Sequence, residues 1–398
     1  MRAGSRYFWL ALVLVVALGV VPLTGCTSDG GGTTEKADET KEPYRIGAVL
    51  SLSGTYAGLG EPEKNALELE VARINDAGGV GGHPIEIVYE DDATDPDTAV
   101  AATTRLVDKE GVLAIIGATG TGQTMAMRQE IDRAGIPQVS IAGGTVITST
   151  FDPLVFQTPW SNAIVMPYTL SYMQKQGIAK IGLISDSGGF GADGAAMAKT
   201  AATAAGITIV AEETFNPGDT DMTSQLTKIK GTDAQAVLMV SAGKEAAIVA
   251  KNMMDLGMDV PIFGTHGNAR KEFIEGAGPA AEGFKFAAGK VLIPELYGAD
   301  SENFAVATDF IDRYTEKYGK APDTFAGHAY DALYLIVNAM KTLDEGFDSA
   351  ALRDAIEATD GFAGIGGTFT FSETDHNGMT ANDLVMYEVT NNAWTEAK

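Results

Sequence analysis

The sequence contains three consecutive segments, YRIGAVLSL (residues 44–52), EKNALELEVARIN (63–75) and IEIVYE (85–90). The first and third segments have the length and the apolar content of buried strands. The middle segment places Leu67 and Val71 at the spacing of one face of a helix. Because a strand, a helix and a second strand in this order form a unit with parallel strands, these residues predict the start of an α/β fold.

The same alternation continues through the rest of the chain. It predicts further strands at 113–116, 181–185, 236–240, 367–371 and 384–389, and further helices at 98–109, 195–205, 244–256, 309–318 and 330–343. Such a pattern favours parallel sheets with helices on both faces. Residues 44–398 provide room for two doubly wound lobes, and the absence of a fixed period argues against a solenoid.

Glycine- and hydroxyl-bearing loops follow the predicted strands. In open α/β sheets, ligands bind at the carboxyl ends of the strands, where these loops lie. The candidate loops are Gly117–Thr121, Ser140–Thr145, Asp186–Gly191, Ser241–Gly243 and Thr265–Asn268. Together they predict a cleft lined by backbone groups and hydroxyls.

The loop AIIGATGTGQT (114–124) is rich in glycine but matches no nucleotide-binding pattern. A Walker loop needs a lysine where this chain has Gln123, and a dinucleotide loop needs a glycine where it has Met125. A helix that begins after this loop would still favour an anion, and a single carboxylate fits as well as a phosphate. A plain turn between strand and helix is the other reading.

Nothing in the sequence indicates catalysis, a cofactor or a metal. There is no G-x-S-x-G elbow, and the four histidines are too far apart for an H-x-x-x-H zinc pair. The acidic run EDDATDPD (90–97) lacks the order of a calcium loop, so we expect a solvated loop in which Asp97 caps the next helix. Glycosidase-type carboxylate pairs cannot be judged from sequence, because their spacing is spatial.

The N-terminal residues predict export and lipid anchoring. Arg2 and Arg6 precede an apolar run over residues 9–21, which is typical of a signal peptide. Leu-Thr-Gly-Cys at 23–26 resembles a bacterial lipobox, and Cys26 is the only cysteine. We therefore expect residues 1–25 to be removed and Cys26 to carry lipid.

Residues 26–43 then predict a flexible tether, since they are rich in glycine, threonine and charge. The formal net charge is −25 and becomes −27 (−25 − 2) without residues 1–25, which disfavours nucleic acid as a partner. The body is thus expected outside the cytoplasm, anchored to the outer face of the cell membrane or in the periplasm.

Several stretches together resemble the branched-chain amino-acid (Leu/Ile/Val) binding proteins. They are SLSGTYAGLGEPEKNALELEVARINDAGGVGGHPIEIVYEDDATDP (51–96), IIGATGTGQT (115–124), GIPQVSIAGGT (135–145), Phe190-Gly191, MMDLGM (253–258) and AYDALYLI (329–336). The resemblance runs from about Tyr44 to the C-terminus. It implies a type I periplasmic binding fold, a monomer whose two lobes close on a small molecule and deliver it to the permease subunits of an ABC importer.

The resemblance also implies lobe boundaries and a carboxylate site. Lobe one would comprise 44–159 and 288–372, and lobe two 160–287 and 373–398. Members of this family bind the ligand carboxylate with a hydroxyl and backbone N–H groups of two loops. The matching residues here are Thr121 and Gly122 in one loop and Ala142, Gly143 and Thr145 in the other.

Apolar and aromatic walls would come from Tyr56, Leu59 and Phe190, whereas Trp160 fits a wall or the core equally well. This family holds the ligand ammonium with an acid and an aromatic residue. The positions that match here are His266 and Ala242.

Neutral histidine offers one acceptor and protonated histidine would repel an ammonium, so the ammonium-binding half departs from the family pattern. Asp186 or Asp331 are alternative acceptors. Two ligand hypotheses follow: a branched-chain or other neutral amino acid, and a small carboxylate or amide without an ammonium, such as an aromatic or keto acid.

A ligand-sensing receptor module is a further alternative, because the same fold serves in receptors. It would need a fused signalling domain or a membrane span, and the sequence indicates neither, so delivery to a transporter is favoured.

Overall fold

The computed structural model describes residues 41–398, so the predicted signal peptide and Cys26 lie outside the described residues. Residues Thr40–Lys398 form one compact unit. Within residues 41–398, no helix combines the length and the apolar character that crossing a membrane requires.

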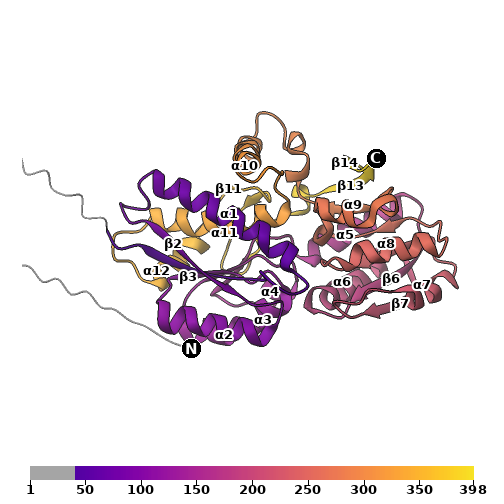
Figure 1. Ribbon diagram of the computed structural model, residues 1–398, viewed down its shortest axis with the longest axis horizontal. Helices are drawn as coiled ribbons and strands as arrows, with labels where there is room; N and C mark the ends of the chain where they lie inside the picture. Colours follow the sequence, from indigo (N-terminus) through magenta and orange to yellow (C-terminus); the bar gives the residue numbers. More distant parts are fainter. Residues whose placement is uncertain (1–40) are drawn as a thin grey trace, which may run out of the picture. The chain divides into compact units, whose positions relative to one another are not determined.

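The first sheet has five parallel strands in the order β2-β1-β3-β4-β5 (Figure 1). Its strands are β1 (Tyr44–Leu50), β2 (Ile85–Asp91), β3 (Ala114–Gly117), β4 (Gln138–Ser140) and β5 (Val155–Gln157). Its helices are α1 (Ala57–Asp76), α2 (Pro96–Arg105), α3 (Thr121–Ala134), α4 (Val146–Ser149), α10 (Glu302–Tyr318), α11 (Thr324–Lys341) and α12 (Ser349–Glu357). Helices α1 and α11 lie on one face and α2 and α3 on the other (Figure 1).

The alternation of side chains along β1 explains these two layers. Ile46 and Leu50 pack into a core shared with α1 and α11. Val49 points to the other face and packs into the core beneath α2 and α3. Because residues 46–50 of β1 are buried on both faces, this stretch contains no charged or polar side chain and does not alternate.

The second sheet has seven strands in the order β14-β13-β10-β9-β8-β6-β7. The strands are β6 (Lys180–Asp186), β7 (Thr208–Phe215), β8 (Ala236–Val240), β9 (Ile262–Phe263), β10 (Lys285–Ala288), β13 (Val385–Thr390) and β14 (Ala393–Glu396). Its helices are α5 (Asn162–Lys175), α6 (Gly189–Ala205), α7 (Thr223–Lys230), α8 (Glu245–Asp255) and α9 (Lys271–Ala277). The α/β fold class is thus confirmed, and the sheet carries in addition two antiparallel edge strands, β13 and β14.

The C-terminal hairpin extends beyond the prediction. A strand was predicted at 384–389, but β14 was not. Asn391 and Asn392 join β13 to β14 with φ angles of 53° and 60°. Asparagine tolerates this left-handed backbone region, which a tight hairpin turn requires. A small separate hairpin is formed by β11 (Phe362–Ala363) and β12 (Thr368–Phe369).

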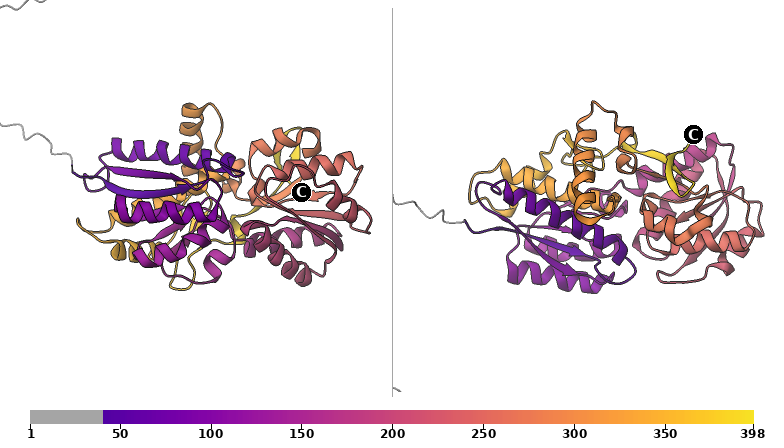
Figure 2. Two further views of the ribbon diagram at one scale, coloured as in Figure 1. Left: turned by 60° about the horizontal axis from the view of Figure 1, so that its bottom comes forward. Right: turned by 45° about the horizontal axis from the view of Figure 1, so that its top comes forward.

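The chain passes between the two sheets after β5, after β10 and before β13 (Figures 1 and 2). Trp160 lies at the first passage, is fully buried, and packs against Gly289 at the second. Asn377, near the third, donates to the carbonyl of Pro159 at 2.8 Å. The three connections therefore pack together. The residue numbers given above for the lobe boundaries stay a prediction, and we call the parts built on the two sheets the first and second lobes.

The acidic loop after β2 caps the next helix with a different residue from the one predicted. Asp95 Oδ1 accepts a hydrogen bond from the Thr98 amide at 2.8 Å, and Pro96 occupies the first helical position. Proline suits that position because its missing N–H is not needed there. The prediction that Asp97 is the cap is therefore wrong, since Asp97 already lies inside the first turn.

Glu70 connects three helices of the first lobe. Its carboxylate on α1 is fully buried, accepts a hydrogen bond from the Tyr334 hydroxyl of α11 at 2.8 Å, and pairs with Arg73 at 3.0 Å and with Arg313 of α10. A buried charge is stable only with such partners.

We expect Glu70→Gln to lower the free energy of unfolding by about 2 kcal/mol, because two charged hydrogen bonds are weakened at a buried position. Urea unfolding followed by fluorescence measures this change. The control is Glu68→Gln on the same helix. The Glu68 side chain is 45% exposed and 3.7 Å from Lys64, so its loss should cost less than about 0.5 kcal/mol. Equal effects of the two changes would contradict the assignment.

Candidate ligand-binding site

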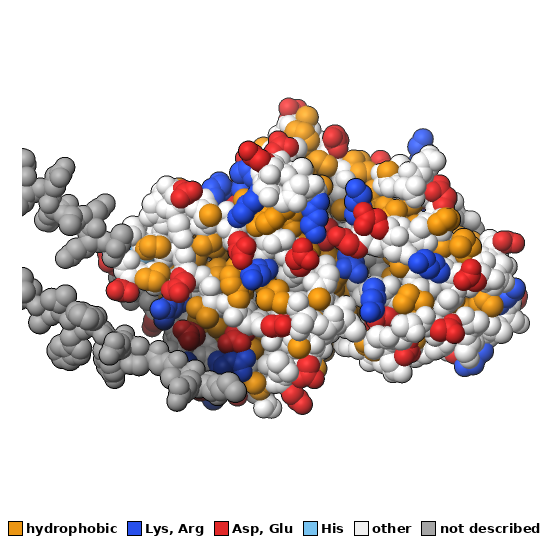
Figure 3. Space-filling view, in the orientation of Figure 1, with side chains coloured by type: hydrophobic (Ala, Val, Ile, Leu, Met, Phe, Trp, Pro, Cys, Tyr) orange, Lys and Arg blue, Asp and Glu red, His pale blue; other side chains and the backbone are white. Residues whose placement is uncertain are grey.

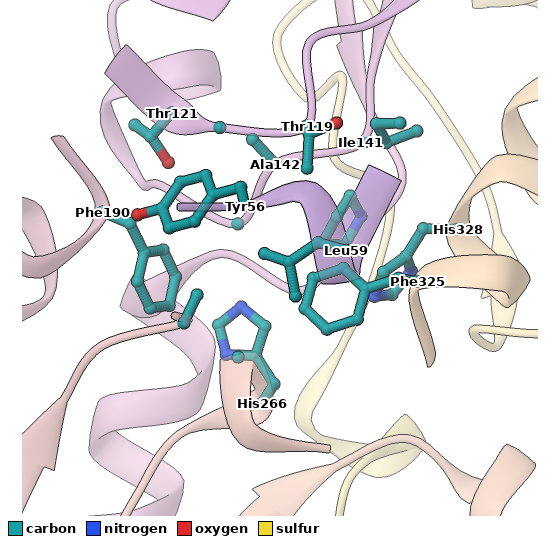
Figure 4. A pocket seen from close by; sticks show the side chains of 15 residues that line it. Tyr56, Leu59, Thr119, Thr121, Ile141, Ala142, Phe190, His266, Phe325 and His328 are labelled. Atoms are coloured by element: carbon teal, nitrogen blue, oxygen red, sulfur yellow. The ribbon is translucent and has the colours of Figure 1, made fainter. Parts of the chain in front are cut away.

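A cavity lies between the two lobes (Figure 4). Its wall combines loops at the carboxyl ends of strands in both sheets with the N-terminal turns of α1 and α11. The lining residues are Tyr56, Leu59, Thr119, Gly120, Thr121, Ile141, Ala142, Gly143, Pro159, Phe190, Ala242, His266, Gly267, Phe325 and His328.

Most of the residues predicted to bind the ligand lie on this wall. They are Tyr56, Leu59, Thr121, Ala142, Gly143, Phe190, Ala242 and His266. Two predicted residues, Gly122 and Thr145, do not line it. Gly122 is instead close to Gly189 of the other lobe, since a Cβ built on Gly189 would lie 2.7 Å from the Gly122 nitrogen.

Thr145 forms hydrogen bonds between the two lobes. Its hydroxyl accepts a hydrogen bond from the Ala163 amide at 2.8 Å, and its own amide donates to Asp193 at 2.8 Å. For Trp160, the sequence left open whether it belongs to the cavity wall or to the core. It is buried beside the cavity, and its ring packs edge-on against that of His328 with the ring centroids 5.4 Å apart.

The sequence analysis missed Phe325 and His328. Both lie in the first turns of α11, which was predicted to begin only at Tyr330. Asp323 caps this helix by accepting from the Ala326 amide at 3.0 Å. An aspartate two residues ahead of Phe325 was a usable signal for the true start of the helix.

Thr121 supplies a buried hydroxyl that is free to bond a ligand. It is the first residue of α3, and its Oγ1 is buried without a hydrogen-bond partner in residues 41–398. The neighbouring Thr119 hydroxyl is already used, because it accepts from the Ser51 amide at 3.0 Å and donates to Glu63 at 2.5 Å. Thr121 and the first N–H groups of a fourteen-residue helix are therefore suited to an anion.

Two buried histidines stand on the opposite part of the wall (Figure 4). Burial lowers the pKa of His266 to about 3; burial, together with the nearby His266, lowers that of His328 to about 3. Both are thus neutral at physiological pH, and each offers one N–H donor and one acceptor. Among the described residues neither nitrogen of His266 has a partner, and Nδ1 of His328 has none.

Among residues 41–398, no aspartate or glutamate lines the cavity. Asp331 was a candidate acceptor for an ammonium. Its carboxylate accepts hydrogen bonds from the backbone amides of Ile365 and Gly366 at 2.6 and 2.7 Å, so both oxygens are already bonded within the fold. Asp186 lies behind the wall. Its Oδ1 accepts from Gly188 at 2.8 Å, its Oδ2 is free, and burial raises its pKa to about 6.

Charges on the surface are mixed. In the face shown in Figure 3, acidic and basic side chains are interspersed over the described residues without an extended basic area.

Within residues 41–398, no group of three histidine, cysteine or acidic side chains could hold a metal ion.

Residues 43–393 match the model of the periplasmic binding protein family, so the chain belongs to this family. An extracellular ligand-binding receptor from Rhodopseudomonas palustris HaA2 is 30% identical, with a TM-score of 0.83 over 90% of this chain and 100% of that one. LivJ, the branched-chain amino acid transporter substrate binding protein of Streptococcus pneumoniae, solved with isoleucine, is 29% identical, with a TM-score of 0.78 over 88% and 97%.

Among curated proteins, Leu/Ile/Val-binding protein homolog 3 of Brucella melitensis is 27% identical over 348 residues, covering 86% of this chain and 91% of that protein. These similarities confirm the predicted family and type I periplasmic binding fold. The protein is accordingly an extracytoplasmic solute-binding protein and not an enzyme.

The contact between Gly143 and His266 tests whether closure of the lobes is needed for binding. A Cβ built on Gly143 would lie 2.2 Å from Nε2 of His266. We expect Gly143→Ala to weaken ligand affinity at least about tenfold, because the methyl group keeps the lobes from closing fully. Calorimetric titration with leucine and its 2-oxo acid measures the affinity.

The matched control is Gly122→Ala, where the nearest atoms to a built Cβ lie at 3.9 and 4.0 Å. It should leave the affinity nearly unchanged. If Gly143→Ala bound as tightly as the control, the closed arrangement of this loop and His266 would not be the binding state.

Proposed function

We propose that this protein is the solute-binding subunit of an ABC importer and that its ligand is a small carboxylate with an apolar body and no ammonium. The absence of any acidic side chain from the cavity wall within residues 41–398 carries this proposal. A 2-oxo acid of a branched-chain amino acid and an aromatic acid are members of this class.

The energetics of burial favour such a ligand. A buried ammonium without a charged partner costs several kcal/mol. The neutral His266 and His328 supply no negative charge to compensate it. A carboxylate, in contrast, meets the Thr121 hydroxyl and the N-terminal amides of α3.

The apolar body would lie among aromatic and aliphatic side chains. Tyr56, Leu59, Phe190 and Phe325 stand on the wall, and Phe190 packs edge-on against His266 at 5.3 Å. The open nitrogens of the two histidines can bond a carbonyl or a hydroxyl group on the ligand. An oxo or hydroxy substituent therefore fits where the family pattern has an ammonium site.

A branched-chain amino acid is the second candidate. It is favoured by the similarity to the pneumococcal protein solved with isoleucine. It would need an acid close to the cavity, and Asp186, with its unpartnered Oδ2, is the available one.

Binding is coupled to closure in this proposal. The cavity takes residues from both lobes, so a ligand satisfies them together only in the closed arrangement. The ligand then shifts the population toward that arrangement, which the importer recognises.

A thermal-shift screen tests the ligand class. The protein is unfolded and refolded to remove bound solute, then heated with leucine, isoleucine, valine and phenylalanine, with the 2-oxo acids of the first three, with benzoate and with short amides. We expect an oxo acid or benzoate to raise the melting temperature, since a ligand at 100 times its Kd adds about 2.7 kcal/mol of stability.

The amino acids should have no effect. A response to amino acids without a response to their oxo acids would overturn the proposed class in favour of the second candidate. In that case Asp186→Asn should abolish the response. Stabilisation by no compound in the screen would count against the carboxylate class as well.

We also propose that Cys26 is lipidated and anchors the protein to the membrane, on the strength of the Leu-Thr-Gly-Cys stretch that precedes it. In cells fed an alkynyl fatty acid, the wild-type protein should become labelled and sediment with membranes. Cys26→Ser should lose both properties. Labelling of the serine variant would place the lipid elsewhere.

A further inference from the structure

Asp193 connects the two lobes by direct hydrogen bonds. It lies on α6 of the second lobe, and its carboxylate faces the start of α4 in the first lobe. Oδ2 accepts a hydrogen bond from the Thr145 amide at 2.8 Å, and Oδ1 accepts one from the Val146 amide at 3.1 Å. The side-chain amide of Asn162 donates to Oδ2 at 2.9 Å.

We propose that Asp193 is a positioning residue for ligand binding, which latches the closed lobes without touching the ligand. Asp193 is not among the residues that line the cavity. The inference rests on the solute-binding role of the family and not on the class of the ligand. It predicts that part of the population is closed before any ligand binds.

The chemistry of the contact suits a reversible latch. Two successive amides at the start of a helix have no partner within that helix, and the two oxygens of one carboxylate match them. Within residues 41–398 no lysine, arginine or histidine lies within 4.0 Å of Asp193, so N–H groups alone compensate its charge. When the lobes separate, water can again solvate the half-buried carboxylate and both amides. The latch therefore favours the closed arrangement only moderately.

The latch and the ligand act on one loop. Ala142 and Gly143 line the cavity, and two and three residues further on Thr145 and Val146 bond to Asp193. The Gly143 carbonyl also accepts from the Asn162 amide at 3.1 Å. By holding this loop, Asp193 fixes the position of the part of the cavity wall that the loop forms. The latch therefore lowers the free-energy cost of lobe closure for every ligand.

Asp193→Ala tests the latch first without a ligand. Alanine suits the interior of α6, so the helix should remain. In small-angle X-ray scattering of the ligand-free protein, we expect a larger radius of gyration for the variant than for the wild type. Hydrogen exchange at the amides of Thr145 and Val146 should become faster.

The control is Asp348→Ala. Asp348 also accepts a backbone amide, that of Ala351 at 2.8 Å, but within the first lobe. It should leave scattering and the exchange at Thr145 unchanged. Unchanged scattering of the Asp193 variant would overturn the proposal, even if exchange became faster, because its role would then be local.

Affinities give the second readout. With leucine and with its 2-oxo acid as probes, each that binds should bind roughly tenfold more weakly to Asp193→Ala, by the same factor. A change in the ratio between the probes would show that Asp193 senses the ligand and would overturn the proposal. If neither probe bound, leucine and its 2-oxo acid would both be excluded as ligands, while scattering and exchange would still decide on the latch.

Discussion

A polar atom that is buried needs a partner, and the closed cleft leaves several without one. The carboxyl ends of strands from both sheets meet there, so hydroxyls, ring nitrogens and backbone amides lose water together. Thr121 Oγ1 and both nitrogens of His266 stay unpaired within the described residues. Each such atom costs about 1–3 kcal/mol, so the closed protein is complete only when a ligand supplies the missing bonds. Solute binding and lobe closure are in this sense one event.

The same burial decides the charge of the cavity. His266 and His328 are neutral because ionisation in a dry environment is expensive. Glu63, one layer behind Thr119, is fully buried, and burial raises its pKa well above the usual value. Its hydrogen bond from Thr119 turns that hydroxyl away from the cavity. Glu63 therefore offers a ligand ammonium little attraction, whereas the Thr121 end still favours an anion.

Local patterns predicted six of the twelve strands in the two sheets, and β4, β5, β7, β9, β10 and β14 were not predicted. The βαβ periodicity placed β1, β2, β6 and β8 to within about two residues, because strand length and apolar content are local properties. Helix starts were less accurate. Helix α1 begins at Ala57 rather than at 63, and Gly60 and Pro62 lie inside it. Packing against α11 overrides the weak propensity of these residues.

The candidate site could be predicted only as far as its loops. Thr121 follows a predicted strand, whereas Ala142 and His266 were assigned to the cleft through the resemblance to the family. Phe325 and His328 come from α11, which sequence alone cannot bring to the carboxyl edge of either sheet. Thr145 was assigned to the ligand because its loop matches a carboxylate-binding loop of the family. The second lobe determines which side of that loop faces the ligand and which side contacts Asp193. The sequence of the loop alone does not determine it.

The affinity of such a protein has two separable parts. One part comes from atoms that touch the ligand, and the other from contacts that lobes make with each other, such as Asp193 with Thr145 and the close approach of Gly122 and Gly189. The second part is independent of what is bound, so it can persist while the cavity changes. Overall similarity, such as the TM-score of 0.83 to a receptor that is 30% identical, therefore does not specify the ligand. For this reason the neutral wall around His266 says more about the solute than the overall similarity does.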